Sequence, residues 1–138
     1  MTKINDAEDL ARLDFATLAN GLYYLTEFVN YQSAAGQFRK IRFFVVDGKI
    51  YPLHHIVGSS WSIHMATRRG KMLGNLAQIG EEEGFLAEFL SIIRPGLSTA
   101  IEALSVRIGL DYFGIDGAIN EDGQLVLFEA NAAMVNSI

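Results

Sequence analysis

The segment DYFGIDGAINEDGQLVLFEAN, residues 111–131, decides the fold. Two apolar runs flank an Asp-Gly pair, and this pattern predicts a β-hairpin. Each arm also carries an acid where a strand normally carries an apolar residue. If Asp122 and Gly123 form a two-residue turn, Asp116 lies directly opposite Glu129. The sequence therefore predicts two facing carboxylates in the middle of the hairpin.

An amide oxygen joins the two carboxylates, because Asn131 lies two residues after Glu129 and shares its face. The opposite face would carry the core-directed residues Ile115, Val126 and Phe128. Facing carboxylates repel each other, and a carboxylate in a half-buried strand is costly to desolvate, so a cation is expected. Oxygen ligands without nearby Cys or His favour Mg²⁺ or Mn²⁺, with substrate phosphates completing the shell. A surface hairpin whose polar face meets water explains the same pattern.

These strands, with Gly-Ile-Asp at 114–116 and Leu-Phe-Glu-Ala-Asn at 127–131, resemble the metal-binding end of the ATP-grasp superfamily. Most of its members are ATP-dependent carboxylate-amine ligases that work through an acyl-phosphate. The resemblance implies that Asp116, Glu129 and Asn131 bind the Mg²⁺ ions that bridge the ATP phosphates. It also implies a nucleotide and a small-molecule acid as the partners.

Length and composition limit the classes of protein that fit. A chain of 138 residues, half of them hydrophobic, predicts one domain with a real core. The net charge of −5 argues against a nucleic-acid binder that relies on bulk electrostatics. The lack of cysteine excludes disulfide scaffolds, thiolate zinc sites and cysteine nucleophiles. No apolar run approaches the roughly 20 residues of a membrane span, so we expect a cytoplasmic protein without a membrane partner.

The rest of the chain predicts an α+β domain with a mainly antiparallel sheet and helices packed on one face. The expected elements are a helix over 7–20, a strand over 22–30, a hairpin of 38–46 with 49–57, a short helix over 61–67 followed by a mobile basic loop, and helices over 81–93 and 98–108.

The first hairpin should turn at Asp47-Gly48, a signal for a type I′ turn. This register places Arg42 opposite Leu53 and Lys40 opposite His55. Lys40, Arg42 and His55 would then share one face of the sheet.

Two further segments resemble ATP-grasp features. LTEFV, residues 25–29, resembles the adenine hinge, which implies that the Glu27 carbonyl accepts from the adenine amino group and the Val29 amide donates to a ring nitrogen. Arg42 resembles the arginine that faces the phosphates or the transferring acyl group, and a guanidinium is a permanently charged fork for phosphoryl oxygens. An ordinary strand would also explain residues 25–29, and a solvated strand face would also explain Arg42.

The resemblance covers roughly residues 22–131 and corresponds to the carboxyl-terminal lobe of the grasp. We therefore expect residues 1–138 to be one partial ATP-grasp domain without the N-terminal lobe, with weak or no ATP affinity on its own. It would be the ATP- and Mg²⁺-binding lobe of a carboxylate-amine or carboxylate-thiol ligase, with Arg42 as a catalytic residue.

The alternatives are a non-catalytic binding module that forms a homodimer and a metal-dependent phosphohydrolase that uses the same acids. Gly114 stands where D-alanine ligase-like relatives often carry arginine, which argues against that branch.

Overall fold

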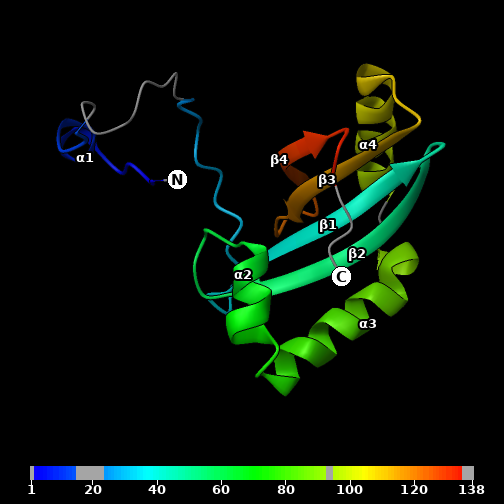
Figure 1. Cartoon of the computed structure of the whole chain (residues 1–138), viewed down its shortest axis with the longest axis horizontal. Coiled ribbons are helices and arrows are strands. Elements are labelled where there is room, and N and C mark those ends of the chain that lie inside the picture. The colour runs from blue at the N-terminus through cyan, green and yellow to red at the C-terminus, as the bar shows by residue number, and fades with distance from the viewer. Residues whose placement is uncertain (1, 15–23, 93–94, 135–138) are drawn as a thin grey trace.

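The protein is described by a computed structural model that covers residues 2–14, 24–92 and 95–134. Its centre is a four-stranded antiparallel sheet in the order β2-β1-β3-β4 (Figure 1). The strands are β1 (Phe38–Val46), β2 (Lys49–Gly58), β3 (Tyr112–Ile119) and β4 (Leu125–Asn131). The sheet and its helices confirm the predicted α+β class.

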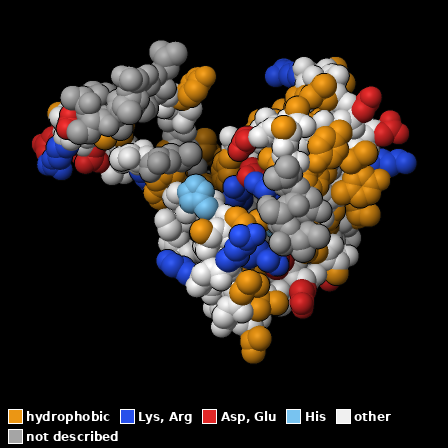
Figure 2. Space-filling model, viewed as in Figure 1, with side chains coloured by type: hydrophobic (Ala, Val, Ile, Leu, Met, Phe, Trp, Pro, Cys, Tyr) orange, Lys and Arg blue, Asp and Glu red, His pale blue; other side chains and the backbone are white. Residues whose placement is uncertain are grey.

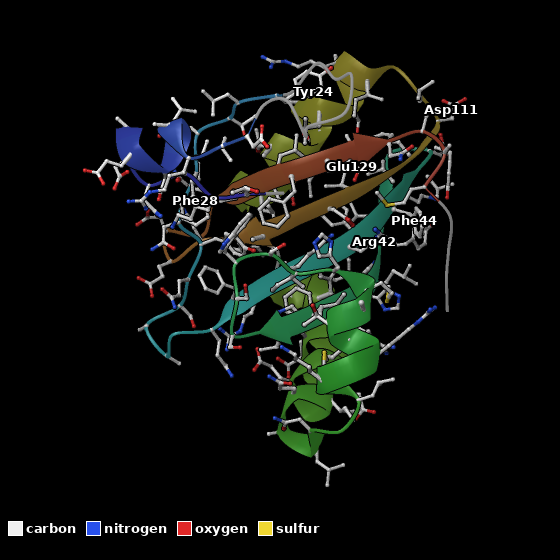
Figure 3. All side chains as sticks on the ribbon, turned by 60° about the vertical axis from the view of Figure 1, so that its left-hand side comes forward. Tyr24, Phe28, Arg42, Phe44, Asp111 and Glu129 are labelled. Atoms are coloured by element: carbon white, nitrogen blue, oxygen red, sulfur yellow. The ribbon has the colours of Figure 1, made fainter. Side chains whose placement is uncertain are left out.

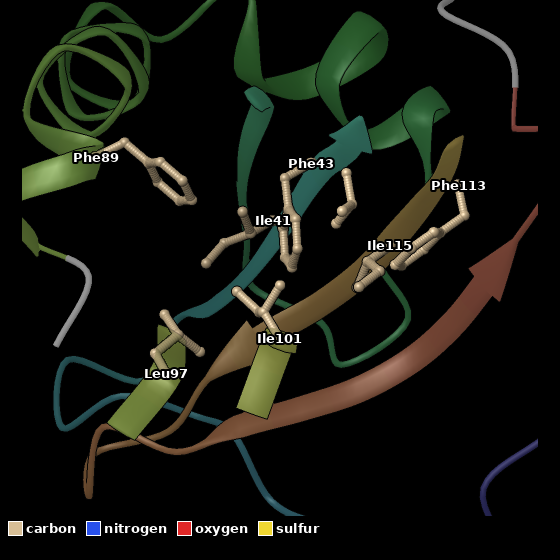
Figure 4. Packing of buried hydrophobic residues seen from close by; sticks show 8 residues of the cluster. Ile41, Phe43, Phe89, Leu97, Ile101, Phe113 and Ile115 are labelled. Atoms are coloured by element: carbon tan, nitrogen blue, oxygen red, sulfur yellow. The ribbon is translucent and has the colours of Figure 1, made fainter. Parts of the chain in front are cut away.

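Two long helices cover one face of this sheet. They are α3 (Leu76–Ile92) and α4 (Pro95–Ile108). The main core lies between them and the strands, and it is formed by Ile41, Phe43, Val45, Phe89, Leu97, Ile101, Phe113 and Ile115 (Figure 4). These residues alternate along β1 and β3 because successive side chains of a strand point to opposite faces.

A second, smaller core lies on the other face, beside the short α2 (Met65–Thr67) and the π-helix η1 (Arg68–Met72). Its buried residues are Tyr31, Phe38, Ile56, Ile63, Met72 and Ala118. The predicted mobile basic loop after residue 67 is therefore wrong, since those residues are helical. Met72 has no exposed surface, and its burial anchors this helix to the sheet.

The first hairpin turns where predicted, but its register shifts. Asp47 and Gly48 both have positive φ, 50° and 70°, as a type I′ turn requires. An irregularity beside Arg42 then moves the pairing by one residue, so Arg42 faces His54 instead of Leu53, and Lys40 faces Ile56. Because one slip moves a side chain to the other face, the predicted placement of His55 beside Lys40 and Arg42 is wrong.

The second hairpin has two departures that cancel. Asn120 N donates to Gln124 O at 3.0 Å, which makes a three-residue loop in place of the predicted two-residue turn, with Gly123 at φ 76°. A second irregularity between Asp116 and Gly117 restores the expected pairing, so Asp116 does face Glu129. The predicted central pair is thus confirmed, although the turn is not.

The same irregularity changes which apolar residues of β4 reach a core. Ile115 is fully buried in the main core, as predicted. Val126 instead packs against the second core, and Phe128 is 41% exposed with its ring 4.9 Å from that of Tyr31. The prediction that all three share one core face is wrong for Val126 and Phe128, because an extra residue in β4 reverses the alternation.

Other element boundaries differ from the predictions. Helix α1 (Ala7–Ala11) is capped by Asp6 and ends well before the predicted residue 20, and residues 15–23 lie outside the described part. Residues 24–30 form no strand, which corrects the strand predicted over 22–30. Helix α3 starts five residues before the Glu81–Glu83 run, because Asn75 Oδ1 accepts from the amides of Ala77 and Gln78.

Candidate functional site

The central pair of strands brings Arg42, Lys40 and Asp116 together on the face opposite α3 and α4. β1 pairs with β3 without any shift, and Arg42 lies directly across from Asp116. Arg42 Nε donates to Asp116 Oδ1 at 2.6 Å, and Arg42 Nη2 donates to Oδ2 at 2.8 Å. Lys40 Nζ lies 2.6 Å from the same Oδ2. We call these three residues the charged triad.

The carboxylate of the charged triad is buried, and its two cations are partly buried. The side chain of Asp116 is only 3% exposed, against 15% for Lys40 and 20% for Arg42. Burial alone would raise the pKa of Asp116, but the hydrogen bonds and charges of Arg42 and Lys40 outweigh it and lower this pKa below 3.8. Since the folded pKa is the lower one, the stability that the ionised carboxylate contributes is retained above about pH 3.8 and lost below it.

Arg42 also interacts with Glu129. Its pKa is raised, first by the hydrogen bond to Asp116 and then, against the effect of burial, by the charges of Asp116 and Glu129. Figure 3 shows Arg42 on β1 and Glu129 on β4, with β3 between them. The site therefore combines two cations with two carboxylates on adjacent strands.

Asn131 completes the predicted ligand set. Its Nδ2 donates to Glu129 Oε1 at 3.0 Å, and its Oδ1 accepts from the amide of Ala133 at 2.8 Å. Asp116, Glu129 and Asn131 thus lie on one sheet face as predicted, with Glu129 exposed and Asp116 buried. All three carry the oxygen donors that Mg²⁺ prefers.

The chain after β4 folds back over the site at Gly114, which pairs with Asn131. A Cβ at Gly114 would lie 2.3 Å from Met134 Sδ and 2.6 Å from its Cβ. Tyr112 Oη donates to the Met134 carbonyl at 2.9 Å and fixes this return. The glycine is therefore required by packing, and an arginine at this position has no room.

The donor set fits a divalent cation in the kind of atoms that it offers, but these atoms are already engaged. Asn131 turns Nδ2 toward Glu129, and its Oδ1 accepts from the amide of Ala133. Both oxygens of Asp116 already accept from Lys40 or Arg42, so a metal bound there would replace these partners. Among the described residues, no group of three or more His, Cys, Asp and Glu could hold a metal ion. A site here therefore depends on the amide oxygen of Asn131 as well as on the two carboxylates.

Glu27 and Val29 lie apart from the sheet ladder, in the irregular segment 24–30, and both are exposed. The segment is held through Phe28, whose ring packs edge-on against Trp61 at 5.9 Å and lies under Lys3 Nζ at 3.7 Å. Within the described residues, neither Glu27 nor Val29 pairs with a strand through its backbone. Their role as an adenine hinge stays a prediction.

A second charged cluster, which the sequence did not predict, surrounds Glu82 on α3. This carboxylate is buried and accepts from Arg68 Nε at 3.1 Å and from the His55 amide at 3.2 Å. His54 Nδ1 lies 3.6 Å away. Glu82 thereby joins α3, β2 and η1. Nothing in the run Glu81–Glu83 distinguishes the buried acid from its neighbours.

Basic side chains also gather on one surface of this acidic protein. Figure 2 shows Lys and Arg side chains near the middle of the visible face, in a chain whose net charge is −5.

No helix within the described ranges has the length and apolar character needed to cross a membrane.

His55 lies on the helix face, in a pocket between α3 and the sheet. Its ring stacks on Phe85 at 4.1 Å, and its Nδ1 is buried without a hydrogen-bond partner among the described residues. Burial lowers the pKa of His55 from 6.5 to about 4. The imidazole is therefore neutral in the folded protein at physiological pH.

The free energy of unfolding should fall by about 2 kcal/mol between pH 7 and pH 5 because of His55. Over this range the unfolded histidine binds a proton, while the folded one with its lower pKa does not, so acidification favours unfolding. Urea denaturation at both pH values measures the change. His55→Phe, which retains a ring against Phe85, should remove it, whereas the exposed His64→Gln should not. An unchanged pH slope in His55→Phe would contradict the assignment.

Comparison with known proteins leaves the site to be judged on its own geometry. No protein-family model, no curated protein and no solved structure matches this chain.

Proposed function

We propose that this chain is the ATP- and Mg²⁺-binding lobe of an ATP-dependent ligase that joins a carboxylate to an amine or a thiol through an acyl-phosphate. The observation that carries the proposal is the Asp116 carboxylate, buried opposite Glu129 and bonded to both Lys40 and Arg42. The ATP-grasp resemblance of the same strands gives the proposal its reaction class.

The cost of burying these charges supports a functional role. A buried ion pair seldom stabilises a fold more than well-packed apolar residues of the same volume would. The charged triad nevertheless occupies the two central strands, where an apolar cluster would pack without desolvation cost. Buried, strongly interacting charges of this kind are concentrated at functional sites.

Each residue of the site has a role in this proposal. Asp116, Glu129 and Asn131 would hold Mg²⁺, which when bound supplies positive charge to offset that of the ATP phosphates. Arg42 presents a planar fork that matches phosphoryl oxygens, and it would stabilise their charge during transfer. Glu27 and Val29 would contact adenine through their backbone groups.

Protein-observed NMR tests the proposal, because it detects the weak binding expected of a single lobe. In ¹H–¹⁵N spectra, Mg²⁺ with a non-hydrolysable ATP analogue should shift signals of β3 and β4, and Mn²⁺ with the same analogue should broaden them near Asp116 and Glu129. Asp116→Asn and Glu129→Gln should weaken binding about tenfold or more, the size of one lost charged contact.

Asp122→Asn serves as the matched control, since it removes an acid from the turn of the same hairpin and should bind like the parent. The spectra also report whether each variant is folded. No response at millimolar analogue from either this chain or a chain extended upstream, or an equal response in Glu129→Gln, would refute the proposal.

A non-catalytic module that assembles as a homodimer is the second candidate, and the edge strand β4 favours it. The strand order leaves β4 at one end of the sheet, with Leu127 and Phe128 43% and 41% exposed. Exposed apolar edges pair readily with other strands. Sedimentation should then show a dimer, and Glu129→Gln should leave assembly intact. A monomer at all concentrations would exclude this candidate.

A further inference from the structure

We infer that the cavity between α3 and the sheet binds a small phenol without negative charge, whose hydroxyl group bonds to His55. This site lies on the helix face of the sheet, opposite the charged triad, so the inference does not depend on the proposed function. Its evidence is the lining of the cavity, the buried nitrogen of His55 and the charges at the rim.

The cavity has the size and the lining of a small-molecule site. Its volume is about 370 Å³. Such sites usually measure about 300–1,000 Å³ and combine apolar walls with a few polar groups. The rings of His55 and Phe85 stack in this wall at 4.1 Å and 13°, and aromatic walls favour an aromatic ligand. The lining residues are Arg39, Ile41, His55, Glu81, Gly84, Phe85, Glu88 and Ile119.

His55 gives the cavity a buried polar group. The residue is 4% exposed, and its Nδ1 has no hydrogen-bond partner among the described residues. A buried polar atom without a partner is unfavourable. The imidazole is neutral because burial lowers its pKa to about 4, so it has one N–H donor and one acceptor nitrogen. A hydroxyl group both donates and accepts, and it therefore suits His55 with the proton on either nitrogen.

A small movement of Phe85 gives a ligand access to this nitrogen. Nδ1 itself has almost no accessible surface. Phe85, which covers one side of the imidazole, is only partly buried. Its neighbour Gly84 leaves open space, because a Cβ at this position would meet nothing within 4 Å. The Phe85 ring can therefore shift when a ligand enters, and the edge of the imidazole becomes accessible.

The charged side chains at the rim determine which sign of ligand is accepted. Arg39 is paired with Glu81, and it also donates to Ser33 Oγ at 2.7 Å. Glu88 adds a second carboxylate to the lining. Two carboxylates therefore oppose one guanidinium, which leaves an excess of one negative charge. This excess repels anions, so the site should disfavour a ligand that carries a carboxylate.

Protein-observed NMR of the whole chain with p-cresol, toluene and 4-hydroxybenzoate tests the inference. p-Cresol should shift the amide signals of His55 and Phe85 to saturation. It should bind about tenfold more tightly than toluene, the effect of one hydrogen bond. The anionic 4-hydroxybenzoate should bind more weakly than p-cresol. No saturable response to p-cresol at millimolar concentration, or equal affinity for either of the other two compounds, would overturn the inference.

Gly84→Leu is the critical variant, because its side chain would fill the cavity. Gly80→Leu, one turn earlier on α3, is the matched control. Both glycines are exposed, a Cβ at either would meet nothing within 4 Å, and leucine favours the helix at both. Only Gly84 lines the cavity. Gly84→Leu should abolish p-cresol binding, and Gly80→Leu should leave it unchanged.

His55→Phe retains a ring against Phe85 and removes the nitrogens, so it should bind p-cresol and toluene equally well. Equal behaviour of the two glycine variants, or a preference for p-cresol that survives in His55→Phe, would show that the phenol does not bind as inferred.

Discussion

Asp116→Ala is expected to lower the free energy of unfolding by about 3–5 kcal/mol at pH 7, the cost of leaving buried cations unpaired. Lys40 and Arg42 lose the only carboxylate within 2.8 Å that the structure shows for them in the described residues, and both are largely buried. Urea denaturation followed by circular dichroism measures the loss.

Two further variants separate the charge effect from a loss of packing. Asp111→Ala removes an exposed acid just before β3 and should change stability by less than about 0.5 kcal/mol. The triple variant Lys40→Met, Arg42→Met, Asp116→Leu replaces the whole charged triad with apolar residues and should recover most of the loss. A loss below about 1 kcal/mol in Asp116→Ala would show that the charges of the triad are not effectively buried.

Phe89→Ala is expected to destabilise the protein by about 3–5 kcal/mol, the usual cost of removing a buried aromatic ring. Phe89 is the residue through which α3 enters the main core, with its ring 6.3 Å from that of Phe43 and 5.5 Å from that of Phe85. Thermal unfolding monitored by circular dichroism detects the change as a lower Tm.

Leu90→Ala is the matched control, because the next residue on the same helix is 78% exposed and should have little effect on Tm. Equal losses in the two variants would mean that α3 does not pack in the orientation described here.

The sequence predicted the local geometry of the sheet well because its turn signals are local. Asp47-Gly48 adopts the predicted turn, and Asp116 faces Glu129. The register beyond Arg42 was wrong because the pairing shifts there, next to Pro52, and a proline in a strand marks either an edge or a bulge without saying which. In β4 the shift lies beside Gly117, and the longer loop and the extra residue cancel only by the time the strand reaches Glu129.

The site was predicted in part for a similar reason. The pairing of Arg42 with Asp116 joins strands more than 70 residues apart, and no turn specifies which strand lies beside which. The sequence therefore pointed to both residues separately but not to their contact. The buried Glu82 was missed because burial depends on how α3 docks, which the pattern of three glutamates does not encode.

The positions of the two register shifts bear on how this sheet can change in evolution. Each shift lies in an outer pair of strands, β1 with β2 or β3 with β4, while the inner pair of β1 and β3 has none. The charged triad belongs entirely to that inner pair. Insertions or deletions in either hairpin turn can therefore be absorbed by the outer strands while Lys40, Arg42 and Asp116 keep their spacing. Homologues should vary in the lengths of these two turns more freely than in the spacing along β1 and β3.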